Sequence, residues 1–286
     1  MQKKRLALVI GVILFLMGSN LPVSILAEEA LSTRPKPLYK KGIEYAAEGK
    51  FKEAEEQFKK NLGINKSDST SLSSLGALKD FKEGKINQEY TLSLFKGLNY
   101  AYDGKPQQAI EELQKAIEIS PEYAKAYNLL GIIYASLGES QEAITYFQEA
   151  IELKPKYAEA YSNLAAVYQS LGRYQEAITH YQKVVQEDPN STEAYINIGA
   201  AYASLGRYQE AITHYQKVIK IDPVYAKAYY SLGLVYLMLD QFTKSEENLQ
   251  KAKELYQQKG DRQSVQTTEE YLNKIHPITD AIKKSP

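Results

Sequence analysis

Residues 170–184 read SLGRYQEAITHYQKV, and residues 204–218 read the same, residue for residue, 34 positions later. Fixed self-similarity at this period is typical of an array in which each repeat is one helix–turn–helix. Such arrays are built from contacts between neighbouring repeats and offer a long curved surface. The repeat therefore predicts an all-α solenoid whose role is to hold other proteins.

Numbered from 1 at residues 124, 158, 192 and 226, the repeats keep the same residue types at fixed positions. The conserved types are tyrosine at positions 4 and 11, glycine or alanine at 8, a small residue at 20 and mostly an aromatic residue at 24. Small residues at 8 and 20 let the two helices approach closely, and the rings fill the space around them. Gly138, Gly172 and Gly206 at position 15 are expected to end the first helix. Prolines at position 32 are expected to end the second helix.

This pattern resembles the tetratricopeptide repeat (TPR) family, and the agreement extends over many positions in several repeats. The resemblance implies a right-handed superhelical array in which the first helix of each repeat lines a concave peptide-binding surface. The residues expected on that surface are Lys125, Asn128, Ile132, Glu159, Ser162, Asn163, Ala166, Gln169, Glu193, Ile196, Asn197, Ala200, Lys227, Tyr230 and Leu234. Asn163 and Asn197 are candidates to hydrogen-bond a ligand backbone, but they are equally explained as common residues at position 6 of the family.

The frame extends beyond the four best repeats. We expect five repeats at 90–123, 124–157, 158–191, 192–225 and 226–259, with a degenerate repeat at 35–68. Residues 69–89 are out of frame; Leu72, Leu75 and Leu78 recur at i+3, which predicts a helical insert ending near Gly84. A capping helix is expected at 260–276 to cover the last apolar face, with a loose tail at 277–286.

The first 27 residues have the layout of a secretory signal peptide, followed by a linker at 28–34. Residues 2–5 read QKKR, residues 6–17 form the apolar run LALVIGVILFLM, and Ala27 precedes a possible cleavage point. Ile25 is not the small residue preferred three positions before the cut, so an uncleaved membrane anchor is the alternative. We expect the chain to be exported across the cytoplasmic membrane, either periplasmic or secreted, or else anchored there by its N-terminus.

Composition and motifs argue against several functions. Basic and acidic residues balance at 35 each, so nothing favours nucleic acid as a partner, and the chain has no cysteine. The sequence contains no phosphate-binding glycine loop, HExxH or GxSxG motif. His180 and His214 occupy equivalent positions, but two histidines alone make a metal site a poor explanation. We expect no enzymatic activity, cofactor or metal.

The favoured interpretation is a non-catalytic scaffold that binds a peptide or protein segment outside the cytoplasmic membrane. The alternative is a TPR subunit of a bacterial envelope secretion or polymer-export complex, which an uncleaved anchor would favour. Membrane contact is expected only if the N-terminal segment stays attached.

If the signal peptide is removed, the mature protein begins at Glu28. Intact-mass spectrometry of the protein from the envelope fraction measures this directly. A mass that still includes residues 1–27 would show a membrane anchor instead.

Overall fold

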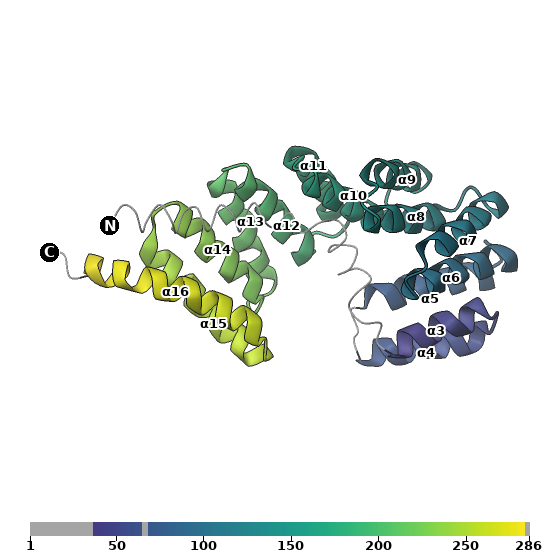
Figure 1. Cartoon of the computed structure of the whole chain (residues 1–286), viewed down its shortest axis with the longest axis horizontal. Helices are drawn as coiled ribbons and strands as arrows, with labels where there is room; N and C mark the ends of the chain where they lie inside the picture. The colour runs from purple at the N-terminus through teal and green to yellow at the C-terminus, as the bar shows by residue number, and fades with distance from the viewer. Residues whose placement is uncertain (1–36, 65–67, 284–286) are drawn as a thin grey trace. The chain divides into compact units, whose positions relative to one another are not determined.

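The computed structural model describes residues 37–64 and 68–283, and this described part contains α-helices and the turns that join them (Figure 1). The all-α fold expected from the repeat is therefore confirmed. The expected signal peptide and linker lie outside the described residues. Among the helices that the structure describes, none has the length and apolar character needed to cross a membrane. The helices group into two compact units that divide near residue 167, and we describe each unit separately.

The first unit holds the degenerate repeat, the insert and the first regular repeats. Its helices are α3 (Pro37–Ala47), α4 (Phe51–Ile64), α5 (Ser69–Lys82), α6 (Gln88–Tyr102), α7 (Pro106–Ile119), α8 (Ala124–Ser136), α9 (Ser140–Leu153) and the part of α10 (Ala158–Ser170) up to residue 167. The second unit continues with the end of α10, then α11 (Tyr174–Glu187), α12 (Thr192–Ser204), α13 (Tyr208–Ile221), α14 (Ala226–Met238), α15 (Phe242–Lys259) and α16 (Arg262–Lys283).

Within a repeat, the ring or leucine at position 24 fills the space left by the small residue at position 8. A Cβ atom added to Gly131 would lie 2.6 Å from the Phe147 ring, and one added to Gly199 would lie 2.5 Å from the Tyr215 ring. Both rings are almost completely buried. The residue at position 15 lies in the turn between the two helices and has a positive φ. The value is +73° at Gly206 and +58° at Asp240, which takes this position in the last repeat.

Regular neighbours stack through the second helix of one repeat and the first helix of the next. This applies to α7 and α8 in the first unit, and to α11–α12 and α13–α14 in the second. The degenerate repeat differs, because its first helix α3 packs directly on α6. Tyr39 meets Tyr102 edge-on at 5.5 Å, and Phe58 stacks on Phe95 at 6.1 Å. The degenerate repeat is thus joined to the array without passing through the insert.

The insert forms helix α5, which packs mainly on α4. Its N-terminus is capped by Asp68, whose Oδ2 accepts hydrogen bonds from the Ser71 amide and from Asn61 Nδ2, each at 2.9 Å. Near its other end, the Phe81 ring lies 4.8 Å from the Phe51 ring. Gly84 follows the helix with φ +70° and reverses the chain, close to where the sequence placed the helix end.

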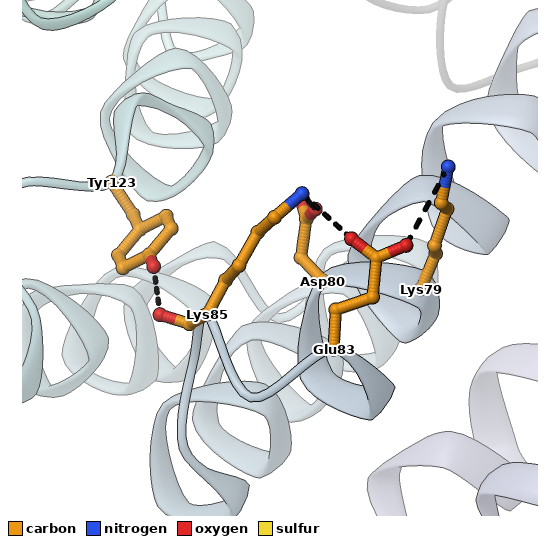
Figure 2. Close-up of polar contacts among 5 residues, drawn as sticks. All are labelled: Lys79, Asp80, Glu83, Lys85 and Tyr123. Carbon is orange, nitrogen blue, oxygen red and sulfur yellow. Dashed lines mark hydrogen bonds and ion pairs between the residues drawn. The ribbon is translucent and has the colours of Figure 1, made fainter.

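The turn after α5 is attached to the start of α8 (Figure 2). The Tyr123 hydroxyl, at the N-cap of α8, donates a hydrogen bond to the Lys85 carbonyl oxygen. The Lys85 ammonium forms ion pairs with Glu83 at 2.7 Å and with Asp80 at 3.4 Å, and it lowers the pKa of Glu83. Since these charged groups are exposed, the ion pairs shape the turn more than they stabilise the fold.

The C-terminal helix is longer than expected. Where the sequence predicted a loose tail from 277, α16 continues through Pro277 to Lys283, so the prediction was wrong for residues 277–283. The proline removes one helical hydrogen bond, but Ile278 beyond it packs against the core cluster of α14, α15 and α16, and Thr279 is buried. Tertiary packing therefore outweighs the local cost of the proline.

Replacing Gly199 by alanine should lower the free energy of unfolding by about 1–3 kcal/mol, because the buried Tyr215 ring must move to make room. Urea unfolding followed by circular dichroism measures the change. Gly76→Ala is the matched control, since a Cβ atom at this helical position meets nothing within 4 Å. The packing argument fails if both substitutions have the same effect.

Candidate peptide-binding surface

We call the surface formed by positions 2, 5, 6, 9 and 12 of the first helices the first-helix face. In the first unit it belongs to α8 and α10 and includes Lys125, Asn128, Ile132, Glu159, Ser162, Asn163 and Ala166. In the second unit it belongs to the end of α10, α12 and α14 and includes Gln169, Glu193, Ile196, Asn197, Ala200, Lys227, Tyr230 and Leu234.

In the first unit, three of the expected residues form one hydrogen-bonded group. Asn163 Nδ2 donates to Asn128 Oδ1 at 3.1 Å, and Asn128 Nδ2 donates to Glu159 Oε1 at 3.1 Å. Asn128 has no exposed surface, so both ends of its amide need partners, and these two bonds supply them. The bonds link α8 to α10 and fix the Glu159 carboxylate at the edge of the group.

The insert helix α5 joins the same group through Ser73. Lys125 Nζ on α8 donates to Ser73 Oγ at 2.8 Å and also to the Ser73 carbonyl oxygen. The Ser73 hydroxyl donates to Glu159 Oε2 at 3.5 Å, at the limit of a hydrogen bond. One hydroxyl thus lies between an ammonium and a carboxylate. No sequence pattern predicted this contact, because Ser73 and Lys125 are 52 residues apart and Ser73 lies in the out-of-frame insert.

Lys125 is half-buried beneath this contact, and burial lowers the pKa of its ammonium to about 8. The Glu159 carboxylate acts in the opposite direction, and its negative charge keeps the ammonium form favoured. Because this pKa still lies above neutrality, the charged form of the amine predominates at pH 7. Lys125 therefore acts as a cationic hydrogen-bond donor toward Ser73 under ordinary conditions.

In the second unit, the expected residues separate into exposed and buried groups. Glu193 and Lys227 are exposed, while Asn197 and Ala200 are partly exposed. Ile196, Tyr230 and Leu234 are buried, and the Tyr230 ring packs edge-on against Tyr271 of α16 at 6.2 Å. Since α16 and its neighbours cover Tyr230 and Leu234, these two side chains contribute to the core of the unit and are not presented at its surface.

His180 and His214 have the same surroundings in successive repeats of the second unit. The His180 ring stacks on Tyr168 at 5.3 Å, and the Arg173 guanidinium lies 4.4 Å from the same tyrosine ring. His214 stacks on Tyr202 at 5.4 Å, with Arg207 at 4.6 Å from that ring. Burial lowers the pKa of both histidines. Within the described residues, no group of three or more histidines and carboxylates is placed to hold a metal ion.

Comparisons with known proteins agree with this architecture. A tetratricopeptide repeat model matches residues 89–156 and 156–223, and a model of a domain of unknown function, DUF6340, matches residues 197–277. None of the curated proteins matches the sequence significantly. In this array of helix–turn–helix repeats, the second helix of one repeat packs on the first helix of the next. This arrangement defines an α-solenoid. The matches span residues 89–223 and, with the similar solved structures, support a TPR protein; TPR proteins bind protein or peptide partners.

Solved structures of similar fold include the TPR proteins MamA and YrrB. "Crystal structure of MamA" is 27% identical, with a TM-score of 0.55, over 58% of this chain and 96% of that one. MamA from Desulfovibrio magneticus RS-1 is 24% identical, with a TM-score of 0.57, over 60% and 98%. YrrB, described as a TPR protein with an unusual peptide-binding site, is 23% identical, with a TM-score of 0.53, over 68% and 97%. The last two likenesses show a common fold.

Because burial lowers the pKa of His180 and His214 below the unfolded value of 6.5, the folded protein favours the neutral rings. Their contribution to stability is complete above about pH 6.5 and is lost as the pH falls toward the folded pKa. Between about pH 7.5 and pH 5, the wild-type protein should lose more stability than the double variant His180→Gln/His214→Gln. Urea unfolding at a series of pH values tests this, and parallel profiles for the two proteins would contradict it.

Proposed function

We propose that the protein is a non-catalytic scaffold that binds a helical or extended segment of a partner protein on its first-helix face. One observation carries the proposal. In the first unit this face already binds one residue of helix α5, because Lys125 and Glu159 at position 2 both bond to Ser73. This contact supports the proposal, because it shows that position-2 side chains can hydrogen-bond a group from a neighbouring helix.

The second unit offers the same kinds of group at equivalent positions. Glu193 and Lys227 occupy position 2, as Lys125 and Glu159 do in the first unit, and Asn197 occupies position 6, as Asn163 does. Ala200 is small and partly exposed, so a ligand backbone can approach α12 closely. The opposite charges at position 2 produce no strong field of one sign, so binding here depends on hydrogen bonding and fit. We therefore assign the partner site to α12 and α14.

We further propose that the protein acts outside the cytoplasmic membrane, as the N-terminal targeting pattern indicates. The partner is then another envelope or secreted protein. The first-helix face carries amide and small side chains and no excess of charge of one sign. Such a surface is suited to recognise a partner segment through its backbone and small side chains.

Asn197→Glu should abolish partner capture with almost no change in melting temperature, because it adds a bulky charge to a partly exposed position outside the core. Gln216→Glu is the matched control, since Gln216 is exposed on the second helix α13 of the same repeat. A photoreactive residue at position 200 first identifies the partner in cells by crosslinking and mass spectrometry. The purified partner is then titrated against the two variants.

We expect binding to be lost only in Asn197→Glu and to change little with salt. If both variants bind the partner as tightly as the wild-type protein, the partner site lies elsewhere on the molecule.

A further inference from the structure

The degenerate repeat contacts the array directly, and not only through helix α5. The degenerate repeat reaches the array through the direct packing of α3 on α6, which includes the Tyr39–Tyr102 and Phe58–Phe95 ring contacts. Apart from packing on α4 and touching α6, α5 contacts α8 and α10 through Ser73, which bonds to Lys125 and Glu159 on their first-helix face. At this point a hydroxyl from an out-of-frame segment occupies the position that a ligand's hydroxyl would take.

The N-terminal half of α5 is held by hydroxyl groups. Ser71 Oγ accepts from Asn61 Nδ2 at 3.0 Å, Ser74 Oγ lies 3.2 Å from the Tyr39 hydroxyl, and Ser73 contacts Lys125 and Glu159. Leu72, in the same half, remains 52% exposed. Leu75 is only partly buried against the core, and the fully buried apolar side chains, Ala77 and Leu78, lie further along the helix. Since each hydrogen bond contributes about 0.5–1.5 kcal/mol net, this half is attached weakly.

The sequence of α5 adds to this weakness. Residues 69–76 read STSLSSLG, and serine, threonine and glycine are poorer helix formers than alanine by about 0.5–1 kcal/mol each. The C-terminal end is anchored better, through the Phe51–Phe81 contact and the bond from Tyr123 to Lys85 shown in Figure 2. The helix can therefore open from its N-terminal half while its other end stays attached.

We propose that α5 is a built-in competitor for the first-helix face of the first unit, and that a partner helix binds there by displacing it. This inference rests on the proposed function, since it assigns a regulated site of the same kind to a second surface. The chemistry of the face defines the partner. Lys125 and Glu159 hold a hydroxyl between them, and the partly exposed Asn163 lies on the same face. The fitting segment is a helix that presents serine or threonine among small residues.

The test uses the full chain and a labelled peptide with the sequence of residues 68–83, DSTSLSSLGALKDFKE. Ser73→Pro breaks α5 in its interior, whereas Ser69→Pro places the same residue at the first helical position, where proline is tolerated. Because a ligand binds only the fraction of molecules whose face is free, Ser73→Pro should bind the peptide at least tenfold more tightly than the wild-type protein. Ser69→Pro should match the wild-type protein.

Lys125→Met in the Ser73→Pro background should remove peptide binding. The proposal is overturned if a folded Ser73→Pro protein binds the peptide no better than the wild-type protein. If that variant fails to fold, hydrogen exchange of the wild-type protein decides. The amides of residues 72–76 should exchange at least tenfold faster than those of α8, and the peptide should accelerate them further; exchange in step with α8 would overturn the proposal.

These measurements need no natural partner, so their outcome is separate from that of the Asn197→Glu experiment. Peptide binding by Ser73→Pro together with intact partner capture by Asn197→Glu would uphold the competitor and reject the site on α12 and α14. The reverse pair of results would reject the competitor alone.

Discussion

The whole array depends on the contact between position 8 of each first helix and position 24 of the second. At Gly131 and Gly199 the missing side chain is replaced by the ring of Phe147 or Tyr215, at distances that leave no room for a Cβ atom. This contact sets how closely the two helices of a repeat approach, and hence the surface that the pair offers to the next repeat. Because each helix pair contacts mainly its neighbours, the same contact between positions 8 and 24 can recur in every repeat.

The sequence predicted this part of the structure well because the contacts that build it recur at a fixed spacing. The position of the helix ends follows from glycines such as Gly206, whose positive φ is common to the series. The course of α16 was harder to predict, since Pro277 normally ends a helix and only the packing of Ile278 explains why it does not. The placement of α5 was not predictable, because the hydrogen bonds that join Ser73 to Lys125 and Glu159 follow no sequence period.

On the candidate surface, too, the contacts that recur with the repeat were predictable and those made by the non-repeating helices were not. Asn128 and Asn163 were expected on one face and do meet there, because their helices are consecutive first helices of the array. Tyr230 and Leu234 occupy equivalent positions but are buried, since α16 follows the last repeat and covers them. Repeat position alone therefore identifies which side chains share a face, whereas exposure depends on what the non-repeating helices cover.

The two copies of the arginine–tyrosine–histidine stack have a consequence for how such a protein evolves. Arg173 and His180 enclose Tyr168 as Arg207 and His214 enclose Tyr202, and the arginines and histidines lie in the identical segments 170–184 and 204–218. A gene duplication that copies one full period inserts a helix pair whose two sides already fit the existing neighbours. The number of repeats can then change in a single genetic event, and the length of the binding surface with it, before any contact between repeats has to be selected anew.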